Sequence, residues 1–152
     1  MNTHKTDIAV EKFLSGYNCA QSILFAYGPG RGLDPEFALK LATGFGAGMA
    51  RQGQVCGAVT GGILALGLKY GRGATDRSAT EETYHKTTLL MTEFERRHGS
   101  CSCRVLLEGC DLRTPEGQKH FKDHDLLHKT CKGCVQSVSE ILGPLMEEPA
   151  GK

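Results

Sequence analysis

The sequence predicts an all-α protein, a compact single-domain bundle of about six to eight helices, some short, with a glycine-rich loop before a buried central helix. Apolar residues recur at helical spacing, and capping residues and glycines bound the segments that carry them. No stretch shows the alternation or the β-branched runs that are typical of strands. A length of 152 residues suits one domain over 1–152, and we expect residues 1–5 and 145–152 to be frayed.

The first quarter of the chain predicts three helices. An apolar stripe over residues 8–14 indicates an amphipathic helix that ends at a glycine. Asn18 is a suitable N-cap for a second helix, because its side chain can accept a hydrogen bond from an unpaired amide of the first turn. In the third helix, Asp34, Pro35 and Glu36 fit the cap and the first two helical positions. Short connections between these helices favour antiparallel neighbours.

A glycine-rich stretch precedes the predicted central helix. Residues 44–54 form a loop with a G-x-G-x-G string, but no strand precedes it and the Lys-Ser/Thr of a P-loop is absent, so a nucleotide site is not favoured. The helix over residues 56–70 then begins at Cys56. Its small residues, Gly57 and Gly61 among them, permit a close approach of neighbouring backbone. The apolar remainder predicts deep burial.

The second half of the chain predicts four further helices. Ser78-Ala79-Thr80-Glu81 has the pattern of a capping box and opens a helix that ends near residue 98. A short helix follows among three cysteines. A charged helix then covers residues 114–128, and the last helix ends at Gly143-Pro144.

The composition limits the partners and the compartment. The net charge is +1 and tryptophan is absent, which argues against nucleic acid as a partner. The longest apolar run is too short for a membrane span, and the N-terminus lacks the apolar core of a secretory signal, so we expect a cytoplasmic protein. Seven cysteines in a reducing compartment indicate metal binding or redox chemistry rather than structural disulfides.

The cysteines fall into three groups along the chain, each next to a predicted helix start. These groups are Cys19 and Cys56; Cys101, Cys103 and Cys110; and Cys131 and Cys134. Helix N-termini stabilise thiolates, and several such termini can converge in a bundle on a metal or a cluster. The spacing is not that of a zinc ribbon, because only one Cys-x-x-Cys is present. No βαβ pattern supports a thioredoxin motif either.

Histidines provide a less favoured set of ligands. His120, His124 and His128 follow one another at intervals of four residues, so they share one face of the predicted helix. His124 and His128 can add to a metal site near Cys131, as can the less favoured Cys101, Cys110 and Cys134. The alternative is a solvated polar face, which the neighbouring charged residues favour.

Four strings then identify a family likeness. They are GYNCAQSIL, GFGAGMARQGQVCGAVTGGILALGLKYG, CRVLLEGCDLRTPEG and KTCKGCVQSVSEIL, and together they cover nearly all of residues 8–142. The chain resembles the redox-active C_GCAxxG_C_C family, a small and mostly bacterial and archaeal group. Its CGAxxG motif reads here as Cys56 to Gly61.

The resemblance implies which cysteines carry the function. The four motif cysteines of the family match Cys19, Cys56, Cys103 and Cys131, whereas the other three cysteines are additional to the pattern. The family name implies redox activity, and a similar domain is associated with an iron–sulfur centre in split-Soret cytochromes. No haem-attachment Cys-x-x-Cys-His occurs in this chain.

Three hypotheses remain open from the sequence. The first is a redox protein, an oxidoreductase or an electron carrier with an unknown redox partner, whose four motif cysteines bind an iron–sulfur cluster or cycle between thiol and disulfide. The second is a zinc-binding or other metal-sensing module without electron transfer. The third is a helical binding domain with no cofactor and with buried free thiols. A small-residue helix also allows packing against a second subunit, so a homodimer is open.

Overall fold

The computed structural model describes residues 3–151 and confirms the all-α prediction. Within that range no β-strand is formed, and Val55 and Ser102 make a single isolated bridge. The helices are α1 (Thr3–Leu14), α2 (Cys19–Tyr27), α3 (Pro35–Ala42), α4 (Gly46–Met49), α5 (Gly57–Tyr70), α6 (Ser78–His98), α7 (Cys103–Leu106), α8 (Pro115–Asp123) and α9 (Lys132–Glu147), with the short 3₁₀ or π turns η1 (Pro29–Arg31), η2 (Thr43–Phe45) and η3 (Leu127–Cys131).

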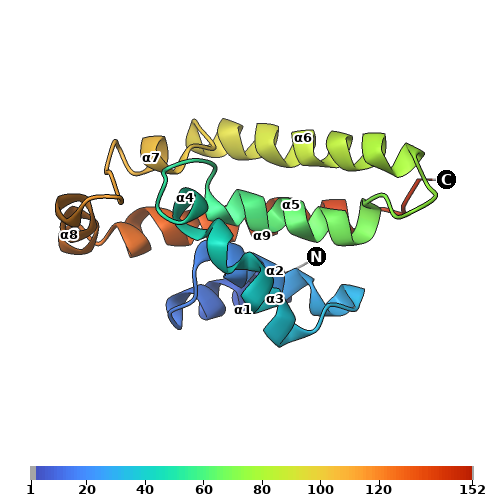
Figure 1. The fold of residues 1–152 in the computed structure, drawn as a ribbon, viewed down its shortest axis with the longest axis horizontal. Coiled ribbons are helices and arrows are strands. Elements are labelled where there is room, and N and C mark those ends of the chain that lie inside the picture. The colour runs from blue at the N-terminus through green and yellow to red at the C-terminus, as the bar shows by residue number, and fades with distance from the viewer. Residues whose placement is uncertain (1–2, 152) are drawn as a thin grey trace.

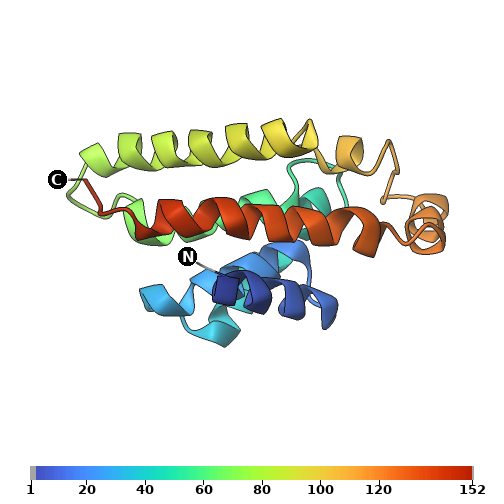
Figure 2. The same cartoon turned by 180° about the vertical axis from the view of Figure 1, so that it is seen from behind.

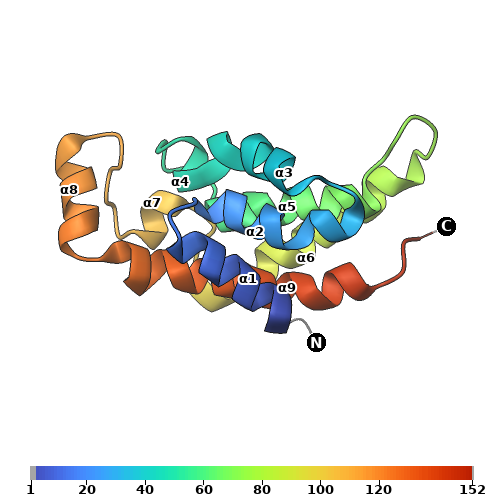
Figure 3. The same cartoon turned by 90° about the horizontal axis from the view of Figure 1, so that it is seen from below.

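Three long helices form the centre of the molecule (Figure 1). Helices α5, α6 and α9 pack on one another, and α1 and α2 cover α9 and α5 on the side away from α6 (Figure 2). Helix α6 runs opposite to α5 and α9, so the start of α5, the end of α6 and the start of α9 lie at the same end. Helices α7 and α8 are found at this end too (Figure 3). The cysteine groups of the sequence are therefore gathered at one end of the bundle.

The core combines apolar packing with hydrogen-bonded polar groups. Tyr27, Tyr70 and Phe94 are among the largest fully buried side chains. The Tyr27 hydroxyl donates to the backbone carbonyl of Ser139 at 2.8 Å, which joins α2 to α9. A buried hydroxyl without such a partner would be destabilising, because it would lose its hydrogen bonds to water.

Several predicted helix ends are confirmed. Asn18 caps α2 in a complete capping box with Gln21. Asp34 caps α3 and Thr114 caps α8, each by accepting a backbone amide. Gly99 ends α6 in the left-handed conformation that glycine adopts without steric penalty. These ends depend on neighbouring residues alone, which is why the sequence predicts them.

The predicted capping box at Ser78 is wrong. Ser78 is already a residue of α6, and the cap position belongs to Arg77, which makes no side-chain cap. The Ser78 hydroxyl instead contacts the Asp76 carboxylate at 2.7 Å. Because Ser78 is the first residue of the helix and not the residue before it, its hydroxyl donates to this local acceptor and caps no amide of the first turn.

The predicted end of the last helix at Pro144 is also wrong. Helix α9 continues to Glu147, and Leu145 and Met146 are buried rather than frayed. Proline removes one helical hydrogen bond, but Tyr70 donates to the Glu148 carbonyl at 2.8 Å and so anchors the end of the helix. Tertiary contacts therefore outweigh the local preference to stop.

At the opposite end of the chain the helical structure begins earlier than the sequence indicated. Helix α1 is already formed at Thr3, so residues 3–5 are helical rather than frayed. Residues 148–151 follow the last helix without regular structure and are exposed, in line with that expectation. Its remaining part, for residues 1 and 2 and for residue 152, lies outside the described residues. Among the described helices none is long and apolar enough to cross a membrane.

Candidate functional site

A cavity of about 210 Å³ lies at the end of the bundle where the cysteines gather. Five thiols line it, those of Cys19, Cys56, Cys103, Cys131 and Cys134. Most of the other lining side chains are apolar, including Phe13, Leu107, Leu112, Phe121 and Leu127. The structure thus brings the four predicted motif cysteines together and adds Cys134 to them.

Helices α2 and α5 begin at the cavity. Cys19 is the first residue of α2, and Cys56 is the N-cap of α5. A Cβ added to Gly57 would lie 2.4 Å from the Cys19 sulfur, so the two helix starts can approach this closely only with glycine at 57. Gly57 lines the cavity, whereas Gly61 lies against Ala20 of α2 and does not line it. That these two glycines bind a cofactor by close backbone approach stays a prediction.

A left-handed turn holds one wall of the cavity. Residues 47–51 all have positive φ, although only Gly48 among them is a glycine. A Cβ added to Gly48 would lie 2.6 Å from the Cβ of Cys103. The backbone of Ala47 hydrogen-bonds to the Cys19 sulfur. Left-handed residues other than glycine are costly and cluster at sites where the surroundings impose them.

The isolated bridge between two loops positions Cys103. The Cys56 amide donates to the Cys101 carbonyl at 2.7 Å, and the Cys103 amide donates to the Gln54 carbonyl at 2.6 Å. These bonds join the loop before α5 to the loop before α7. Cys103 then starts α7 and lines the same cavity as Cys56, although 46 residues separate them in the chain.

Cys131 and Cys134 reach the cavity from one continuous helical segment. The π turn η3 leads directly into α9, and Cys131 has right-handed helical geometry at the junction. The expectation that these two cysteines open the last helix is confirmed, since Cys131 is the N-cap of α9 and Cys134 lies in its first turn. The π turn before them means that this helix start is not a free N-terminus. Their sequence spacing still places them one turn apart and facing the same end of the bundle.

The cavity thiols hold their protons strongly. The pKa of Cys19 is raised well above its ordinary value by hydrogen bonding to Cys56 and by burial. Hydrogen bonding to Cys134 raises the pKa of Cys56 in the same way. Burial, followed by the nearby thiols, raises the pKa of Cys103 to about 11 and that of Cys131 to about 12. The thiols are consequently neutral near pH 7 until a metal or an oxidant removes their protons.

Two cysteines lie outside the cavity. Cys101 is buried with its sulfur 3.7 Å from the Met91 carbonyl, and burial raises its pKa to about 11. The Cys110 thiol donates to the Gly117 carbonyl at 3.1 Å. The structure therefore separates these two, which the sequence placed with Cys103, from the cavity wall.

The predicted histidine stripe does not form. Helix α8 ends at Asp123, and Asp125 adopts a left-handed conformation before η3 begins. His124 stacks on His120 with ring centroids 3.9 Å apart, whereas His128 pairs with Asp125 at 2.8 Å. None of these histidines lines the cavity. The break in the helix separates residues that a continuous helix would have aligned.

No covalent or single-ion centre is formed by the side chains as they stand. All seven cysteines are free. Among residues 3–151, no three His, Cys, Asp or Glu side chains are arranged to hold one metal ion. The five thiols surround a space instead of converging on a single point.

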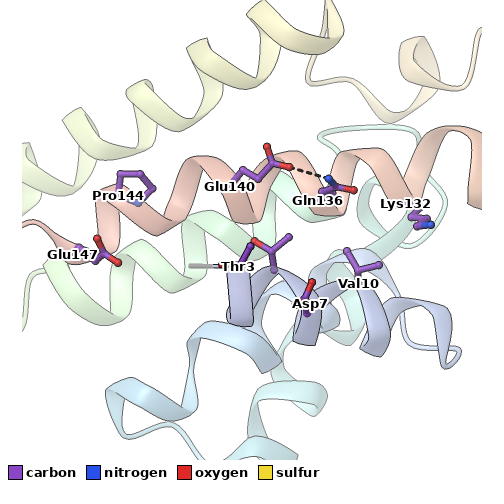
Figure 4. Close-up of a pocket in the computed structure, with 9 residues that line it drawn as sticks. Thr3, Asp7, Val10, Lys132, Gln136, Glu140, Pro144 and Glu147 are labelled. Atoms are coloured by element: carbon purple, nitrogen blue, oxygen red, sulfur yellow. Dashed lines mark hydrogen bonds between the residues drawn. The ribbon is translucent and has the colours of Figure 1, made fainter. Parts of the chain in front are cut away.

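A second hollow, of about 640 Å³, lies between α1 and α9 (Figure 4). Its lining is mainly polar and includes Asp7, Lys132 and Glu147. Gln136 donates to Glu140 across one turn of α9 at 3.0 Å. This groove contains none of the predicted site residues, so the cysteine cavity is the candidate functional site.

Fold and site together define a class: small helical proteins in which helix starts present several thiols to one apolar cavity. The comparison with protein families makes the assignment specific. Residues 17–145 match the family described as "Putative redox-active protein (C_GCAxxG_C_C)", and the chain belongs to this family. No curated protein and no solved structure was found to match it.

Proposed function

We propose that this protein is a redox protein whose cavity holds an iron–sulfur cluster through Cys19, Cys56, Cys103 and Cys131. The observation that carries the proposal is the presence of all four motif cysteines on one apolar cavity. The chain is long enough to form a core without cross-links, so stability alone does not explain this arrangement.

The donor set suits such a cluster. Iron–sulfur clusters are held by cysteine thiolates, and hydrogen bonds to the sulfurs tune their potentials. Backbone groups of Ala20 and Ala47 hydrogen-bond to the Cys19 sulfur, and that of Ala58 to the Cys56 sulfur. A single zinc ion needs four ligands at about 2.3 Å from one point. Thiols that surround a space fit a cluster of several atoms better than they fit a single zinc ion.

Residues around the cavity would bind the iron–sulfur cluster and shield it from water. A bound cluster would supply one-electron transfer. The amides at the starts of α2 and α5 would stabilise the thiolate charge, and Phe13, Leu127 and their apolar neighbours would limit access of water. Because free thiols persist in reducing compartments, we place this chemistry in the cytoplasm.

Anaerobic purification followed by iron, sulfide and visible-absorption analysis tests the proposal. We expect iron and sulfide in the wild type and in Cys101→Ser, whose thiol is buried outside the cavity. We expect Cys131→Ser to lose most of both. A colourless, iron-free wild-type protein would reject the cluster, and stoichiometric zinc in its place would favour the sensing module.

Thiol–disulfide cycling at Cys19 and Cys56 is a second candidate. It is favoured by the hydrogen bonding between these two side chains. In this case a partner disulfide would be reduced to two thiols while Cys19 and Cys56 lose two protons and two electrons. Mild oxidation should then protect both cysteines from alkylation, and free alkylation of both would exclude this cycle.

A further inference from the structure

Helix α8 and the loop before it are only loosely joined to the rest of the molecule. The helix lies beyond the end of the three-helix bundle and runs across the direction of α9 (Figure 3). Of its nine residues, all of them described, Gly117 alone is buried. An element with so little buried surface has low local stability, so it can move while the rest of the fold stays intact.

Residues 110–124, which contain this helix, make most of their polar contacts with one another. The Cys110 thiol donates to the Gly117 carbonyl at 3.1 Å, and the Gly117 amide donates to the Thr114 hydroxyl at 2.9 Å. A Cβ at Gly117 would overlap the Asp111 carbonyl oxygen, so the segment closes tightly on itself. It therefore forms a unit that can move as one piece.

Few contacts fasten this unit to the bundle. Beyond the turns at its two ends, one ion pair joins it to the rest of residues 3–151, between the Arg104 guanidinium of α7 and the Asp111 carboxylate at 3.2 Å. Two of its apolar side chains, Leu112 and Phe121, line the cysteine cavity. The unit thus covers one side of the cavity and is held there by two apolar side chains and one charged contact.

Backbone suited to a hinge flanks the unit on both sides. Glu108 and Gly109 precede it with φ of 55° and 86°, and Asp125 follows it with φ of 51°. Left-handed backbone is strained for residues other than glycine, so a rotation of Glu108 or Asp125 into the right-handed region relieves strain. Hinges are a few loop or element-terminal residues that absorb such a rotation.

We propose that residues 110–124 form a lid that opens by rotation at these two hinges and admits small molecules to the cavity thiols. Opening withdraws Leu112 and Phe121 from the cavity wall and breaks the ion pair of Asp111. Cys56 is 6% exposed with the lid closed, so its thiol becomes accessible when the lid opens. The lid thereby controls access to the site.

One consequence rests on the proposed function. If the cavity holds an iron–sulfur cluster, iron and sulfide enter while the lid is open, and the closed lid keeps water from the bound cluster. The movement itself does not depend on a cluster, because the contacts that define the lid involve none of the four motif cysteines.

Iodoacetamide labelling of the folded, metal-free protein tests the lid, with Cys56 as the reporter and Cys101 as the internal control. Both thiols are buried, but Cys101 lies outside the cavity. Trypsin places them on different peptides, residues 52–69 and 98–104, and fragmentation of the second peptide separates Cys101 from Cys103. Rates are compared at one pH, so the raised pKa of the Cys56 thiol affects all variants alike.

Phe121→Ala should accelerate the labelling of Cys56 about tenfold, because the lid loses its largest apolar contact with the cavity, and should leave Cys101 unchanged. The matched control is Lys122→Ala at the next, exposed residue of α8, where both rates should equal those of the wild type. An unchanged Cys56 rate in Phe121→Ala would overturn the proposal. Equal acceleration at Cys56 and Cys101 would also overturn it, because it would report unfolding of the whole chain.

The ion pair provides a test that leaves the cavity wall intact. Asp111→Asn weakens the contact with Arg104 and should accelerate Cys56 labelling about two- to fivefold. Asp123→Asn breaks an ion pair with Lys119 inside the lid and should change the rate little. Equal Cys56 rates in these two variants would overturn the proposal.

The wild-type protein provides a test without any substitution. A lid movement exposes little surface, so low concentrations of urea should leave the Cys56 labelling rate nearly unchanged. If this rate instead rose with urea as steeply as the equilibrium constant for unfolding, Cys56 would become accessible by global unfolding and the lid would be refuted. Iron analysis is a separate measurement, so failure of the cluster proposal and failure of this one are distinguishable.

Discussion

Gly61→Ala is the sharpest test of how helices α2 and α5 position the cysteines. The added Cβ would lie 2.8 Å from the Ala20 carbonyl oxygen and 3.1 Å from both the Cα of Ala20 and the Cβ of Ile23. Since part of this wall is backbone, it cannot move aside by a rotamer change, and the two helices must separate. Cys19 and Ala20 are the first two residues of α2, so the site would be disturbed as well.

The expected change in the free energy of unfolding of Gly61→Ala follows from two opposing effects. Alanine is about 1 kcal/mol better than glycine inside a helix, but overpacking a close contact costs about 1–3 kcal/mol. Because two of the three contacted atoms are backbone and cannot move aside, the upper part of that range applies, about 2–3 kcal/mol. We therefore expect a net loss of about 1–2 kcal/mol, or a fall in Tm of about 2–8 °C for a chain of this size. The matched control is Gly67→Ala in the same helix, where no heavy atom lies within 4 Å of the added Cβ. There we expect a gain of about 0.5–1 kcal/mol.

Urea unfolding of the reduced, metal-free proteins, followed by circular dichroism, gives the comparison. The midpoint should fall for Gly61→Ala and rise for Gly67→Ala, with unchanged slopes. If Gly61→Ala were as stable as the wild type, the close approach of α2 to α5 at this position would be refuted. If both variants lost stability equally, the cause would not be the contact with Ala20.

Three further predictions concern single side chains. In the metal-free protein Cys131 has a pKa of about 12, so its thiolate fraction at pH 8 is about a thousandfold below that of an ordinary thiol. Iodoacetamide should therefore label Cys131 far more slowly in the folded protein than in an unfolded control. Equal labelling rates would contradict this prediction. Burial, followed by the charge of Arg97, lowers the pKa of His98. The folded state then binds fewer protons than the unfolded state, so the free energy of unfolding should fall as the pH drops below about 6.5. This loss should be smaller in His98→Gln when unfolding is measured across pH. Thr114→Ala removes the N-cap of α8 and should lower the free energy of unfolding by about 1 kcal/mol. Ser78→Ala should change the unfolding midpoint little. If Ser78→Ala instead cost more stability than Thr114→Ala, Ser78 would have to act as a helix cap.

The sequence predicts those parts of the fold that depend on neighbouring residues. Helical periodicity and the caps at Asn18, Asp34 and Thr114 are local, so they are readable without the tertiary structure. The placement of Cys19 and Cys56 at helix starts is local for the same reason. These features already indicate where the thiols lie along the chain.

Other features cannot be read from helical periodicity and cap patterns. Helix α9 passes through Pro144 because Tyr70 anchors its end, and Ser78 is not a cap because α6 begins at Ser78 itself. The helix expected over residues 114–128 breaks at Asp125, which separates His128 from the other two histidines. These outcomes depend on individual contacts and backbone conformations, which the pattern of hydrophobicity does not show.

The cysteine cavity shows most clearly which features the sequence determines and which depend on the tertiary structure. The sequence alone determined an all-α chain that belongs by its strings to a cysteine-motif family, and it selected four cysteines by resemblance. Only the tertiary structure decided that these four line one cavity and that a fifth, Cys134, lies with them. The physical reason is that helix periodicity fixes the face on which a residue lies, whereas the packing of α2, α5 and α9 fixes which faces meet.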